Sequence, residues 1–76
     1  MSDHIETRKR LQAIPSIASF DELLDKSTLS DLDKTILRMH YLKYKDFRFI
    51  GDTLGYSEGA MKKRHVKALA KLKKLL

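Results

Sequence analysis

The stretch "FIGDTLGYSEGAMKKR", residues 49–64, decides the fold because it joins two helix patterns through a short turn. Gly55 is suited to the left-handed conformation that ends a helix, and Ser57 can cap the helix that follows. Gly51 is small at a point where two backbones must approach each other. Two helices joined by a three-residue turn containing glycine are the layout of a helix-turn-helix, so we expect that motif here.

Capping residues and apolar spacing predict helices before this motif as well. Asp46 caps its first helix. A preceding helix begins at Ser30, and its apolar residues recur at helical spacing: Leu32, Ile36, Met39 and Leu42. Two further helices are expected near the N-terminus, one capped by Ser2 and stopped by Pro15, the other opened by a Ser19–Glu22 capping box.

The expected fold class is therefore all-α, a small helical bundle containing a helix-turn-helix with extra N-terminal helices. We divide it into an N-terminal helical extension, residues 1–28, and a helix-turn-helix domain, residues 29–76. A chain of 76 residues forms one small domain, too small for an enzyme pocket between separate lobes. Four aromatic residues around the start of the motif are expected to pack in its core: Tyr41, Tyr44, Phe47 and Phe49.

The positive charge is concentrated at the C-terminal end. The net charge is +6; residues 57–76 carry seven basic side chains and one acidic one, 7 − 1 = 6, while residues 1–56 carry nine of each. A basic block on one helix is typical of nucleic-acid binding, because each neutralised phosphate releases condensed counterions. The alternative is a solvated, lysine-rich helix face.

In a helix-turn-helix the second helix lies in the major groove and presents its first turns to base edges. We therefore expect residues 58–75 to form the recognition helix. Lysine reaches guanine acceptors, glutamate accepts from a cytosine amine, and glycine lets the backbone approach. The base-reading candidates are Glu58, Gly59, Lys62 and Lys63, and the phosphate-contact candidates are Ser57, Arg64, Lys67 and Lys71.

Residues 29–76 resemble domain four of bacterial sigma factors, which reads the promoter −35 element, and its relatives in small phage regulators. The matching pieces are Leu29, Asp33 and Lys34, the apolar pair Ile36 and Leu37, and "MHYL". The stretch 49–64 is similar to the family pattern "EIAEELGISEGTVKKR" almost position for position. The resemblance implies a double-stranded DNA-binding regulator of transcription.

Four positions depart from that pattern. Phe49 replaces a glutamate, Gly51 an alanine and Ala60 a threonine, while His65 lies where leucine or isoleucine is common. Residues 1–28 are too few for the domain that melts the −10 element, so we expect a sigma-like regulator rather than a complete sigma factor.

Other site chemistry is weakly indicated. The chain has no cysteine, and its three histidines, His4, His40 and His65, share no metal-ligand spacing. We therefore expect no metal, no cofactor and no enzymatic activity. His65 is expected to be a packed side chain. No signal peptide or membrane span is expected, so we place the protein in the cytoplasm.

Two alternatives to DNA reading stay open. In the first, the motif and its C-terminal helix bind RNA polymerase or a sigma factor without reading DNA. In the second, the basic helix lies on anionic lipid. One recognition helix covers only a few base pairs, so we expect useful specificity to require either a second copy of the chain, in a homodimer, or a larger partner. The C-terminal leucines, Leu69, Leu72, Leu75 and Leu76, exceed what the motif must cover and suggest a partner surface.

Overall fold

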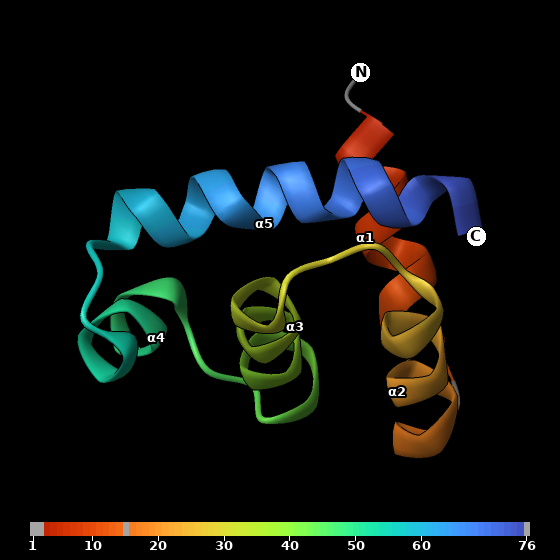
Figure 1. Ribbon diagram of the computed structural model, residues 1–76, viewed down its shortest axis with the longest axis horizontal. Coiled ribbons are helices and arrows are strands. Elements are labelled where there is room, and N and C mark those ends of the chain that lie inside the picture. Colours follow the sequence, from red (N-terminus) through yellow and green to blue (C-terminus); the bar gives the residue numbers. More distant parts are fainter. Residues whose placement is uncertain (1–2, 15, 76) are drawn as a thin grey trace.

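The computed structural model describes residues 3–14 and 16–75, which are helical apart from short connections (Figure 1). The elements are α1 (Asp3–Gln12), α2 (Ile17–Lys26), α3 (Asp31–Leu37), the π-helix η1 (Arg38–Leu42), α4 (Phe47–Leu54), α5 (Glu58–Leu72) and the 3₁₀-helix η2 (Lys73–Leu75). The expected all-α bundle is confirmed, and α4 and α5 form its helix-turn-helix. The predictions made for Ser2 and Pro15 fall outside the described residues.

The caps around the motif are those the sequence predicts. Asp46 accepts a hydrogen bond from the Phe49 N–H at 2.7 Å, and Ser57 accepts one from the Ala60 N–H at 3.1 Å. Gly55 ends α4 in the left-handed region, with φ at 84°. Side-chain caps of this kind satisfy N–H groups that have no partner within the helix, so they fix where α4 and α5 begin.

The start of α2 corrects one expectation. The helix begins at Ile17 with Ser16 as its N-cap, and the Ser16 hydroxyl accepts from the Ser19 N–H at 3.1 Å. Ser19 is therefore inside the first turn and does not open the helix. Phe20 and Leu24 lie on the same face one turn apart, and both are buried.

The helix predicted from Ser30 onward is not a single α-helix. Ser30 caps it as expected, accepting from the Asp33 N–H at 3.2 Å, but the α-helical part ends at Leu37. In the π-helical turns that follow, the Lys43 N–H donates to the Arg38 carbonyl at 3.2 Å. A π-helix accommodates one extra residue per turn and is rare outside functional sites.

Two clusters of buried side chains hold the bundle together, and α5 contributes to both. The front cluster consists of Ile36, Ile50 and Met61, from α3, α4 and α5. The rear cluster joins α1, α2 and the α3–η1 segment to the second half of α5; its members are Leu11, Phe20, Leu24, Leu29, Leu37, Tyr41, Ala68, Leu69 and Leu72. Figure 1 shows α5 running along one side of the molecule, with α4 and α3 near its start and α1 crossing near its end.

The rear cluster accounts for two of the C-terminal leucines. Leu69 and Leu72 are fully buried against the N-terminal helices, so the partner surface that they suggested is supplied by the chain itself. Leu75 remains 47% exposed. Leu76 lies outside the described residues.

The four aromatic residues near the motif divide into two pairs. Tyr41 is buried and Phe47 partly buried, but Tyr44 and Phe49 are 88% and 46% exposed, so the expectation that all four pack in the core is wrong. Tyr41 shares a hydrogen bond of 2.6 Å with Nε2 of His65 on α5. His65 is buried, as expected for a packed side chain. This bond joins η1 to α5 inside the core.

Burial raises the pKa of Tyr41 to about 12, although the nearby Arg8 opposes the rise. An unfolded tyrosine titrates near 10. The contribution of Tyr41 to folding stability is therefore fully present below pH 10. It is lost as the pH rises toward 12, because over this range the unfolded tyrosine gives up its proton while the folded one retains it.

We expect the free energy of unfolding to fall between pH 10 and 12 by about 1.4 kcal/mol for each unit by which the folded pKa exceeds the unfolded one. Urea unfolding across this range checks the decline. Tyr41→Phe should remove this component, and Tyr44→Phe, at an exposed position, should leave it in place. An equal alkaline decline in Tyr41→Phe and the parent protein would contradict the assignment.

The closest backbone approach in the motif lies at Gly51. A Cβ atom built on this residue would lie 2.5 Å from the Tyr56 carbonyl oxygen and 3.2 Å from backbone atoms of Ser57. The Gly51 carbonyl also accepts hydrogen bonds from the Gly55 and Tyr56 N–H groups, both at 2.8 Å. The turn therefore folds back directly onto the place where the side chain is missing.

Gly51→Ala should destabilise the protein by about 1–3 kcal/mol, because the added methyl group meets backbone rather than a side chain that can move. Gly59→Ala is the matched control, since nothing lies within 4 Å of a Cβ at that position. It should be neutral or stabilising by up to about 1 kcal/mol. Thermal and urea unfolding measure both; equal stabilities for the two variants would show that the turn is not constrained at Gly51.

Candidate nucleic-acid interface

The first turn of α5 lies at the surface. Ser57, Glu58 and Gly59 are exposed, whereas Ala60 is partly buried and Met61 is fully buried in the front cluster. Space around Gly59 is open, so a ligand can approach its backbone closely. This is the arrangement that a recognition helix requires at its leading end.

Four lysines continue along the exposed side of α5, and we call them the basic face: Lys62, Lys63, Lys67 and Lys71. The opposite side of the helix carries His65, Leu69 and Leu72, which are buried. Residues three and four apart are neighbours on a helix, so Lys63, Lys67 and Lys71 form one continuous cationic row, and Lys62 lies beside its start. Glu58 is the sole acid among residues 57–75.

One ion pair lies on this surface. Lys62 Nζ is 3.3 Å from a carboxylate oxygen of Glu58, one turn earlier, with side chains 61% and 47% exposed. An exposed pair at this spacing contributes only a few tenths of a kcal/mol. Both groups therefore exchange readily with outside partners.

Arg64 occupies a different environment from the lysines. Its Nη1 donates to Oδ1 of Asp33 on α3 at 3.2 Å, and its guanidinium carbon is 5.9 Å from the centroid of the Tyr56 ring. Only 12% of the Asp33 side chain is exposed, against 41% for Arg64. This contact fixes α5 to α3, and sequence reasoning missed it because no local pattern links residues 31 positions apart.

Basic residues at the start of α4 also lie at the surface and were not among the predicted site residues. Arg48 is exposed, and Lys45 Nζ lies 4.9 Å from the centroid of the exposed Phe49 ring. In helix-turn-helix proteins the first helix crosses the nucleic-acid backbone, so the signal was present in the sequence.

The remaining chemistry is limited. No group of three or more histidine or acidic side chains lies close enough to hold a metal ion within residues 3–14 and 16–75. None of the helices in the described part of the chain has both the length and the apolar character needed to cross a bilayer.

An exposed helix start, a glycine-built turn and a cationic helix face on a helical bundle define a DNA-binding helix-turn-helix domain of the kind found in transcription regulators. The family model "Sigma-70, region 4" matches residues 27–74, well over half of the chain. The protein belongs to this family. Comparisons with curated proteins and with solved structures gave no match.

Asp33→Ala should lower the free energy of unfolding by about 1–2 kcal/mol. The substitution removes a largely buried carboxylate that pairs with Arg64, and the Arg64 guanidinium is itself partly solvated. Asp31→Ala is the control: it removes an exposed acid from the same first turn of α3, with a similar effect on the helix dipole. Urea unfolding of both variants isolates the ion pair. Equal losses would assign the effect to the helix terminus instead.

Proposed function

We propose that the protein is a sequence-specific double-stranded DNA-binding regulator whose α5 enters the major groove. The observation that carries the proposal is the exposed first turn of α5, which leads directly into the basic face. A helix start of this kind, held on a rigid bundle, matches what major-groove reading demands of shape and charge.

The residues divide into two groups by the contact that each is assigned. We assign base reading to Glu58, Gly59, Lys62 and Lys63, which lie within the first two turns. Contacts to phosphates are assigned to Ser57, Arg64, Lys67 and Lys71. Arg64 stays in this group because part of its side chain is exposed, and Asp33 holds the guanidinium in place rather than enclosing it.

The pair between Glu58 and Lys62 bears on specificity. In free protein each side chain neutralises the other at 3.3 Å. On a duplex, a cytosine amine would take the place of Lys62 as the partner of Glu58, and Lys62 would turn to a guanine or a phosphate. A DNA sequence that offers neither contact leaves the pair between Glu58 and Lys62 intact and gains no binding energy from it. This difference is a basis for discrimination between DNA sequences.

A second candidate function is a protein-interaction module that binds RNA polymerase or a sigma factor without reading DNA. It is favoured by three partly exposed apolar side chains on and beside the motif: Phe49 on α4, Tyr56 in the turn and Val66 on α5, each 43–46% exposed. Rings and aliphatic groups of this size are common anchors of protein interfaces. RNA polymerase is also compatible with the first candidate, as is a homodimer that reads two half-sites.

Measuring duplex binding by fluorescence anisotropy against salt concentration separates the candidates. A DNA reader should show a linear fall of log K with log salt, and each lost phosphate contact should reduce the slope by about 0.9. Lys62→Ala/Lys63→Ala should weaken binding strongly, whereas Lys9→Ala/Lys26→Ala removes the same charge elsewhere and should change it little.

Single substitutions then test the individual assignments. Lys63→Ala should relax discrimination between target and random duplex by about 1–3 kcal/mol, while Lys67→Ala should weaken all sequences alike. Equal losses in both double variants, or binding that is nearly independent of salt, would contradict major-groove reading and favour the protein-interaction module.

A further inference from the structure

A second surface, away from the basic face, is formed where α1 and α2 meet η1. It contains two hollows that share Gln12, Tyr41 and Tyr44 in their walls. One has a volume of about 280 Å³, and we call it the polar hollow because charged and polar side chains, Arg8 and His40 among them, line it, although most of its exposed wall is apolar. The other has a volume of about 580 Å³ and is lined mainly by apolar side chains, among them Ile14, Ile17 and Leu42. The volume of the apolar hollow lies in the range of small-molecule sites.

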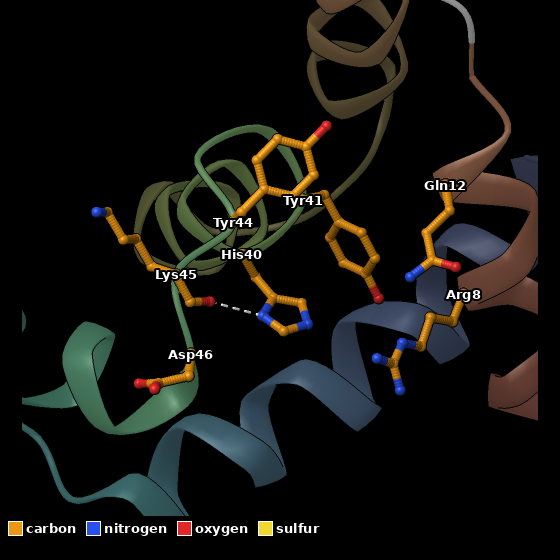
Figure 2. Close-up of a pocket in the computed structure, with 7 residues that line it drawn as sticks. All are labelled: Arg8, Gln12, His40, Tyr41, Tyr44, Lys45 and Asp46. Atoms are coloured by element: carbon orange, nitrogen blue, oxygen red, sulfur yellow. Dashed lines mark hydrogen bonds between the residues drawn. The ribbon is translucent and has the colours of Figure 1, made fainter.

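The polar hollow presents hydrogen-bond donors from one helix. Arg8 and Gln12 are one turn apart on α1, and both side chains extend toward the Tyr41 hydroxyl (Figure 2). Within residues 3–14 and 16–75, Arg8 has no ion-pair partner, whereas Arg10 on the same helix is paired with Glu6 at 3.0 Å. Arg8 is exposed, so its guanidinium is solvated and can be reached by a carboxylate from outside the protein.

The other charged groups of the polar hollow are directed elsewhere. The Asp46 carboxylate accepts from the Phe49 N–H at 2.7 Å, and Lys45 Nζ lies over the Phe49 ring. Figure 2 shows both side chains extending away from Arg8. Nδ1 of His40 is engaged with the Lys45 carbonyl at 2.9 Å. The charge that faces the hollow is therefore that of Arg8, which is positive.

Tyr44 lies at the boundary of the two hollows and is held in an unusual conformation. Its φ of 57° is the one positive value at a non-glycine residue in the described chain, a conformation that costs on the order of 1 kcal/mol. This conformation ends η1: the Lys45 N–H donates to the Met39 carbonyl at 3.0 Å, and a left-handed residue is common just after a helix. The ring itself is 88% exposed. Ile17, which also lines the apolar hollow, is 64% exposed.

We propose that these two hollows form one binding site for a small organic carboxylate, with Arg8 and Gln12 holding the carboxylate and the apolar hollow holding an alkyl or aryl chain. Charge complementarity selects an anion, because Arg8 is the charged group directed into the polar end. The adjoining apolar walls select a ligand with a hydrophobic part rather than an inorganic ion. Tyr44 would close over the junction of the two parts. This site does not depend on DNA binding by α5.

Isothermal titration calorimetry with octanoate, kept below its micelle concentration, tests the site, and octanol is the uncharged comparison. Octanoate should bind at least about tenfold more tightly than octanol. Arg8→Gln should weaken octanoate binding about tenfold, and Lys9→Gln, the same change of charge one residue away on an exposed position, should alter it less than twofold. Ile17→Asp should weaken it through the apolar part.

Circular dichroism and thermal unfolding confirm that each variant keeps its fold before it is titrated. Nuclear magnetic resonance adds a readout of position, since octanoate should shift the side-chain amide signals of Gln12 and the Arg8 Nε–H. These shifts should appear in Lys9→Gln and be lost in Arg8→Gln.

Several results would overturn the proposal. Equal binding of octanoate and octanol, equal weakening by Arg8→Gln and Lys9→Gln, or no heat and no Gln12 shift at millimolar octanoate would each do so. The peptide acetyl-Leu-Leu, compared with a free and with an amidated C-terminus, tests whether the site binds a terminal carboxylate carried by a peptide or protein. Binding of the free form alone, with octanoate inactive, would assign the site to a peptide and reject the small acid.

Discussion

The α5 helix must bury one side in two separate clusters, and much of the structure depends on this constraint. Met61 fills the front cluster with Ile36 and Ile50, and Leu69 and Leu72 fill the rear cluster about two to three turns further along the helix. Because one face of α5 is buried along its whole length, only the opposite face is exposed to solvent. The lysines occupy that remaining face, so the same packing that stabilises the bundle presents the basic face to solvent.

The ion pairs of the other helices bear on the charge of the basic face. The Arg38 Nε is 2.7 Å from Asp21 and a second guanidinium nitrogen is 3.8 Å from Asp25, so these acids serve the contact between α2 and η1. Asp33 is used by Arg64 in the same way. These acids are paired with arginines and lie on other elements, so the lysines of α5 keep a field that attracts phosphate. A field of this kind increases association rates as well as affinity.

The sequence could predict those features that depend on neighbouring residues. Asp46, Gly55 and Ser57 act within three or four residues of themselves, so their capping roles follow directly from local chemistry. Ser16 and Ser19 are both of a residue type that caps helices, and the structure uses Ser16, whose hydroxyl accepts from the Ser19 N–H. The spacing of Ser19 and Glu22 matches a capping box, so the local pattern placed the start of α2 three residues late.

Longer-range features had no local signal. The spacing of Met39 and Leu42 suits a continuous α-helix, yet η1 is a π-helix in which Tyr41 is brought to His65, 24 residues away. Similarly, Leu69 and Leu72 could be recognised as apolar, but nothing in the order of residues says that Leu11 and Phe20 cover them. Of the candidate interface, the composition and exposure of the basic face could be foreseen; the anchoring of Arg64 by Asp33 could not.

Tyr41 links the two surfaces of the molecule. It lines both hollows, and its hydroxyl is hydrogen-bonded to Nε2 of His65 on α5 at 2.6 Å. His65 lies between the turns that carry Met61 and Leu69, and both of those residues are fully buried. Close-packed clusters resist small displacements, so a ligand resting on Tyr41 would not shift α5 without disturbing both cores. Occupancy would instead stabilise the folded bundle as a whole, by an amount set by ligand concentration and affinity. The link between the surfaces therefore works through the stability of the scaffold rather than through a movement of the recognition helix.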